Sequence, residues 1–152
     1  MFKRIFFLGL TAGIMASAAA VIFQRIHQFA TYTDFSKIVN VPVLLAINIG
    51  VCMLASVLFF LLQKLSPGRK GRFIFNLIFV LISFMSITWS FALTLPLDAQ
   101  FPELFPGLTV PMHFFPALAW FTFEPLFIAG SRHRGEEKKQ SIRRIKKDGI
   151  VI

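Results

Sequence analysis

Glu124 lies inside a segment that is otherwise almost entirely apolar. Residues 110–127 read VPMHFFPALAWFTFEPLF, and the glutamate is followed directly by Pro125. Proline has no backbone N–H, so within a helix it frees the carbonyl of Phe121, one turn earlier. A carboxylate beside a freed carbonyl can bind a cation or a proton, and ionisable residues in membrane segments are functional candidates by default. The pattern therefore suggests an ion or proton site.

The same glutamate also has a structural interpretation. In a helix from about Pro111 to Gly130 it would lie ~9 Å from one end, and His113 would share its face, ~16 Å away, with Ala117 and Trp120 between them. Basic side chains at the ends of neighbouring helices would then be within reach of the carboxylate, namely Lys3, Arg4, Lys64 and Arg72. An ion pair with one of these remains open beside the functional site.

Other residues that could do chemistry are few. Two asparagines, Asn48 and Asn76, can bind an ion or ligand with Glu124, or bond across helices. His27 and His113 are candidates for a metal or redox site, because three acidic residues fall near the same membrane face: Asp34, Asp98 and Glu103. The signal is weak, since the sequence has no HxxxH or HExxH spacing. The single cysteine, Cys52, cannot form an intramolecular disulfide. We expect no cofactor.

The candidate residues lie in or next to four segments of the sequence that contain no charged residue. No Lys, Arg, Asp or Glu occurs in 5–24, 41–62, 73–97 or 104–123, and 56% of the 152 residues are hydrophobic. Each run approaches the ~20 apolar residues needed to cross a membrane. The sequence therefore predicts an all-α polytopic membrane protein: a four-helix domain over 1–130, with helices at about 5–28, 41–62, 73–95 and 111–130, and a basic tail over 131–152.

The basic residues predict the orientation. Of the 16 Lys and Arg residues, only Arg25 and Lys37 fall on the opposite side from the rest. Positive residues stay in the cytoplasm, so both termini and the 63–72 link are expected there. The first segment resembles a secretory signal with an Ala16-Ser17-Ala18 site, but its apolar run continues through Val21, Ile22 and Phe23, and we expect it to remain as an anchor.

Small residues follow each other at helical spacing in the first segment. They form two rows four residues apart, one of Gly9, Gly13 and Ser17 and one of Ala12, Ala16 and Ala20. Small residues let helix backbones approach closely in lipid. The strip predicts a packing face toward helices of the same chain, with a seam between chains as the alternative.

The two outer links differ in composition. Asp34 in the first link is expected to cap a short helical piece. The second link, PLDAQFPELFPGLTVP, carries four prolines (Pro96, Pro102, Pro106 and Pro111), which predict an irregular loop that covers the outer ends of the helices.

The stretches TDFSKIVNVP and LPLDAQFPELFPGLTVPMHFFPALAWFT resemble those of small uncharacterised four-helix membrane proteins of bacteria. The resemblance covers most of 1–128 and leaves the basic tail outside. It implies the same topology in a bacterial inner membrane, and it carries no activity.

Three functions stay open. The first is a non-enzymatic accessory or scaffold component that acts through helix packing and a basic tail against anionic lipid headgroups, as a homo-oligomer or in a larger membrane complex, without nucleic acid. The second is a small transporter or an ion or proton pathway that uses Glu124 with Asn48 or Asn76. The third is a metal or redox site at His27 and His113.

Overall fold

The computed structural model describes residues 2–92 and 101–148, with side chains as far as Ile128. It contains four long helices: α1 (Phe2–Thr31), α2 (Val41–Leu65), α3 (Arg69–Ala92) and α4 (Phe105–Asp148). A short 3-10 helix, η1 (Pro102–Leu104), precedes α4. All four helices are long and apolar enough to cross a membrane, and the span in the last of them ends at Ile128. The prediction of an all-helical chain with four such helices is confirmed.

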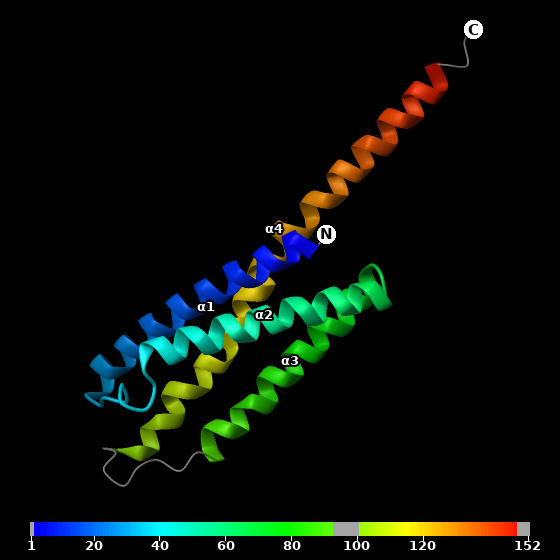
Figure 1. Cartoon of the computed structure of the whole chain (residues 1–152). Helices are drawn as coiled ribbons and strands as arrows, with labels where there is room; N and C mark the ends of the chain where they lie inside the picture. The colour runs from blue at the N-terminus through cyan, green and yellow to red at the C-terminus, as the bar shows by residue number, and fades with distance from the viewer. Residues whose placement is uncertain (1, 93–100, 149–152) are drawn as a thin grey trace.

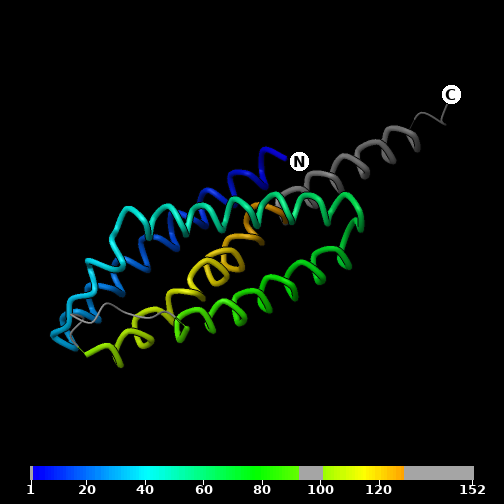
Figure 2. Tube along the Cα trace, turned by 60° about the horizontal axis from the view of Figure 1, so that its bottom comes forward, coloured from blue at the N-terminus to red at the C-terminus, as the bar shows by residue number. Residues whose placement is uncertain are grey.

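The helices run alternately in opposite directions. Figures 1 and 2 show the N-terminus and the α2–α3 turn at one end of the molecule, and the α1–α2 link and the start of α4 at the other. Helix α1 packs against α2 and α4, whereas α3 lies at the edge and packs against α4 and α2. We call the first of these ends the basic end, because six of the basic side chains described are located there: Lys3, Arg4, Lys64, Arg69, Lys70 and Arg72.

Close approach between α1 and α2 depends on two glycines. A Cβ atom added to Gly13 would lie 2.8 Å from the Cα atom of Ile49, and one added to Gly9 would lie 2.8 Å from the Cys52 carbonyl oxygen. Ser56 Oγ donates across this interface to the Ile5 carbonyl, at 3.1 Å. The glycine row of α1 therefore packs inside the chain.

The remaining small residues of α1 are buried as well. Ser17 donates to the Gly13 carbonyl of its own helix, at 2.7 Å, and is 4% exposed. Ala12 belongs to the core cluster around Trp120, whereas Ala20 packs with Phe105 of α4. Ala16 lies between these two and is buried. The two rows thus let α1 lie between α2 and α4.

The link between α1 and α2 is fastened to the helices. Gln24 Nε2 donates to the Val39 carbonyl at 2.6 Å, and Phe35 is buried against Phe105. The Asp34 carboxylate accepts from the Ser36 backbone N–H at 2.8 Å and opens a single turn. Asn40 then caps α2, because its side chain accepts from the Val43 backbone N–H. This link therefore covers that end of the bundle.

The proline-rich segment differs from the prediction. Residues 93–100, including Pro96, lie outside the described residues, but the chain is helical from Pro102 onward and α4 begins at Phe105 rather than near Pro111. Pro106 falls in the first turn of α4, where a backbone N–H has no acceptor within the helix, so proline is tolerated there. Burial of Phe105 and Leu108 against α1 and its link favours this earlier start.

Helix α4 is also longer than predicted at its other end. It continues to Asp148 instead of ending near Gly130, so most of the basic tail is helical. Three prolines lie inside it, at 111, 116 and 125. Neighbouring helices can stabilise a membrane helix where proline removes a backbone donor.

Candidate functional site at the α3–α4 contact

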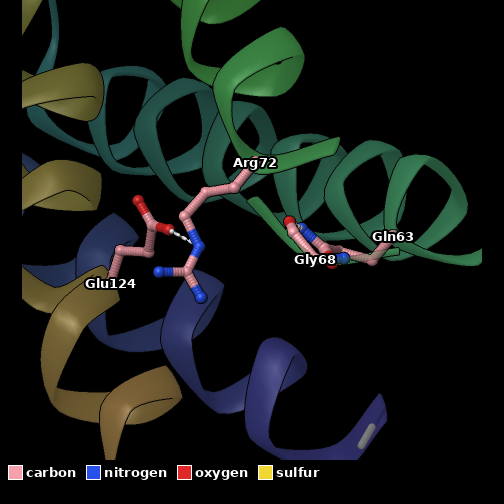
Figure 3. Close-up of polar contacts among 4 residues, drawn as sticks. All are labelled: Gln63, Gly68, Arg72 and Glu124. Atoms are coloured by element: carbon pink, nitrogen blue, oxygen red, sulfur yellow. Dashed lines mark hydrogen bonds and ion pairs between the residues drawn. The ribbon is translucent and has the colours of Figure 1, made fainter. Parts of the chain in front are cut away.

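Glu124 is paired with Arg72. The carboxylate is on α4 and 6% exposed, and its Oε1 atom lies 3.1 Å from Nε of Arg72 on α3 (Figure 3). The arginine side chain keeps 37% of its surface exposed, whereas the glutamate side chain keeps 7%. The pair thus joins the edge helix α3 to α4 near the basic end. Of the four basic candidates that the sequence offers, the structure brings Arg72 to the acid.

A tight turn fixes the position of Arg72. Gly68 adopts a positive φ of 93°, which favours glycine, and its backbone is held in both directions by the Gln63 side chain (Figure 3). Helix α3 begins at the next residue, and Gly71 then lies directly against the Ser66 carbonyl. With the first turn of α3 fixed in this way, Arg72 is directed back toward α4.

Asn76 and Trp120 lie one turn further into the bundle. Residues four apart share a helix face, and because α3 and α4 are antiparallel, Asn76 lies level with Trp120 when Arg72 lies opposite Glu124. The Asn76 side chain lies beside the Glu124 carboxylate. The structure therefore brings together two of the sequence candidates, Glu124 and Asn76.

Aromatic rings close the inner side of this contact. The Trp120 ring is fully buried, with centroid distances of 5.2 Å to Phe75, 5.7 Å to Phe59 and 6.1 Å to Phe79. Such aromatic pairs stabilise a packed core through their favourable edge and offset geometries. They also separate the polar contact from the middle of the bundle.

Four buried polar atoms on these facing turns of α3 and α4 have no hydrogen-bond partner among the described residues. They are Arg72 Nε, Asn76 Oδ1, Trp120 Nε1 and Glu124 Oε1. The two charged atoms attract each other at 3.1 Å but lack the alignment of a hydrogen bond. Buried polar atoms are nearly always satisfied in native proteins, either by protein groups or by ordered water.

Asn48 does not join this site. Its side chain donates to the Leu44 carbonyl of its own helix at 2.8 Å. One turn along α2, Cys52 approaches the Pro116 carbonyl at 4.0 Å, and Pro116 precedes Glu124 by ~12 Å along α4. Asn48 therefore lies in the other half of the bundle.

The two histidines face different helices. His27 lies beside Gly107 of α4 and against the rings of Phe23 and Phe35. His113 Nδ1 donates to the Thr109 carbonyl at 2.7 Å and lies 3.4 Å from Ser90 Oγ on α3. Within the part of the chain that the structure describes, no group of three His, Cys, Asp or Glu residues could hold a metal ion. Asp98 lies outside that part.

The α4 strip that contains His113, Trp120 and Glu124 turns toward α3. Its contacts there are Ser90, Phe75 and Arg72, in the order expected for antiparallel helices. The sequence placed these residues on one face but did not indicate which helix they meet. Comparison of the chain with protein-family models, curated proteins and solved structures found no match.

Proposed function

We propose that this chain is a non-enzymatic integral protein of a bacterial inner membrane, with both termini in the cytoplasm, and that it acts as an accessory or scaffold component. The observation that supports this most directly is the ion pair between Arg72 and Glu124. A pathway needs its acid free to exchange an ion or proton, whereas a scaffold can use the acid to hold two helices together. Breaking such a pair leaves a buried charge uncompensated.

The basic tail is the second part of the proposal. The sequence after Ile128 carries eight Lys and Arg residues, namely Arg132, Arg134, Lys138, Lys139, Arg143, Arg144, Lys146 and Lys147. Basic residues next to a membrane helix are attracted to anionic headgroups by about 1 kcal/mol each. A scaffold would use this attraction to keep its cytoplasmic segment at the membrane surface.

A proton or ion pathway through Glu124 and Asn76 is the second candidate. The observation that favours it is the group of buried polar atoms without hydrogen-bond partners around the acid. Asn48 has no part in this version, because its amide bonds to its own helix.

Proton flux into liposomes distinguishes the two candidates. The purified full-length chain is reconstituted with a pH-sensitive dye inside, and a potassium gradient with valinomycin drives protons inward. A scaffold predicts the same acidification rate as protein-free liposomes. Faster entry that Glu124→Gln abolishes and Asn48→Leu retains would establish the pathway instead.

Extraction of the membrane into polymer-bounded discs tests the scaffold directly. We expect the chain in an assembly of fixed stoichiometry, as a homo-oligomer or with another polypeptide. Recovery of the chain as a monomer with lipid alone would contradict the proposal.

A further inference from the structure

We infer that the α3–α4 contact binds a water molecule between Arg72, Asn76, Trp120 and Glu124. Arg72 Nε and Trp120 Nε1 are hydrogen-bond donors, whereas Asn76 Oδ1 and Glu124 Oε1 are acceptors. One water molecule offers two donors and two acceptors, so its bonding capacity matches this group. The inference holds for either function proposed above, because both keep these four side chains at the same contact.

Burial makes the group a site rather than a surface feature. Trp120 is fully buried and Glu124 is 6% exposed, and neither Trp120 Nε1 nor Glu124 Oε1 has a hydrogen-bond partner among the described residues. Buried waters in proteins typically make about three hydrogen bonds to polar groups that are otherwise unsatisfied. A water at this position would also bridge the charged pair, whose own geometry lacks hydrogen-bond alignment.

The contact borders the basic end on one side. Arg72 is exposed over 37% of its side chain there, so the water of this proposal would enter and leave on the side of the arginine. On the inner side, the rings of Phe75 and Phe79 pack against Trp120 and close the contact. The bound water therefore exchanges with the basic end of the molecule and not through the bundle.

The test measures water contact at the Trp120 indole. The full-length chain is labelled with ¹⁵N at tryptophan Nε1 and on the backbone, reconstituted in bilayers, and observed by solid-state NMR with magnetisation transferred from water. The chain has two tryptophans, so Trp89→Phe assigns the two indole signals. The backbone N–H of Phe79 serves as the reference for a group without water contact, because Phe79 lies about one turn deeper in α3 than Asn76.

We expect rapid transfer from water to the Trp120 indole and none to the Phe79 amide. Asn76→Leu removes one acceptor of the site and is expected to abolish the transfer, whereas the matched variant Asn48→Leu leaves it unchanged. If the Trp120 indole of the wild type received no more magnetisation from water than the Phe79 amide, that result alone would overturn the inference. Unchanged transfer in a folded Asn76→Leu protein, with the other signals in place, would also overturn it.

Discussion

At the scale of single residues, the chemistry of this chain centres on one acid and its neighbours. In the sequence, the position of Glu124 in an apolar segment before a proline suggests a functional site. In the structure, Arg72 at 3.1 Å gives the glutamate a structural partner. The partial exposure of the arginine matters, because solvent around its side chain screens the attraction between the two charges. The ion pair is therefore a moderate constraint on α3 that acts together with the packing of Trp120.

Loss of the arginine tests that constraint. Arg72→Gln leaves Glu124 buried without its charge partner, so we expect the free energy of unfolding to fall by about 1–3 kcal/mol. The measurement is unfolding by SDS titration in mixed micelles. Arg69→Gln is the matched control, since Arg69 is exposed in the same turn, and equal losses in the two variants would contradict a specific role for Arg72.

Asp34 gives a pH-dependent prediction at the same scale. The Ser36 backbone N–H that donates to it lowers the pKa of this carboxyl below 3.8, its ordinary value. Because the folded-state pKa is depressed, the stabilising contribution is present above the unfolded pKa and is lost as pH falls through the folded value. Carboxyl ¹³C NMR should show a midpoint below 3.8 in the wild type. Substitution of Ser36 by proline, which has no N–H, should raise that midpoint.

At the scale of helices, small residues and turns determine which elements meet. Gly9 and Gly13 bring α1 against α2, and the Gln63–Gly68 contacts start α3 at the position from which Arg72 reaches α4. The edge helix α3 relies on α4 and α2 for its contacts. Disturbing the α1–α2 interface should thus affect stability more than an equal change on an open face.

Gly13→Ala and Gly50→Ala form a matched pair for this prediction. A Cβ atom at Gly13 would lie 2.8 Å from Ile49 Cα, whereas one at Gly50 meets nothing within 4 Å. We expect Gly13→Ala to cost about 1–3 kcal/mol through overpacking. Gly50→Ala should be neutral or stabilising by up to about 1 kcal/mol, because alanine favours helix. SDS titration measures the free energy of unfolding of both variants. A larger loss for Gly50→Ala than for Gly13→Ala would contradict the packing of Gly13 against α2.

Much of the helix pattern follows from the sequence, and the exceptions have local causes. The four charge-free runs locate the four helices, because a bilayer excludes charge over a fixed length. One further signal, Asn40 two residues before Pro42, marks the start of α2 and did not enter the prediction. The start of α4 was missed because proline density suggested a loop, although Pro106 falls in a first turn that tolerates it.

The sequence indicates which residues could take part in the site, but it predicts less well which of them meet. Spacing places Trp120 and Glu124 on one face, but it contains no information on which helix packs there. The choice of Arg72 over Lys3, Arg4 or Lys64 depends on the α3–α4 contact and on the tight turn at Gly68. Likewise, the separation of His27 from His113 depends on helix packing, because His27 of α1 lies beside Gly107 of α4, whereas His113 of α4 faces Ser90 of α3.

At the scale of the whole molecule, charge is distributed unevenly between the two ends. The basic end carries six Lys and Arg residues among the described side chains, whereas only Arg25 and Lys37 lie toward the other end. Under the positive-inside rule this asymmetry predicts a cytoplasmic basic end.

Cysteine labelling in intact bacterial cells checks this orientation. In a Cys52→Ser background, Ser36→Cys in the α1–α2 link should react with a membrane-impermeant maleimide. Ser66→Cys in the α2–α3 turn should react only after the cells are permeabilised. Labelling in the reverse order would invert the proposed topology.

The most direct test of the central claim, that Glu124 holds α3 to α4 through Arg72, is a double-mutant cycle on unfolding. Arg72→Gln, Glu124→Gln and the double variant are compared with the wild type by SDS titration. The account predicts a coupling of about 0.5–3 kcal/mol, with the double variant less destabilised than the sum of the single ones. Additive losses would contradict it and would leave Glu124 free for the pathway.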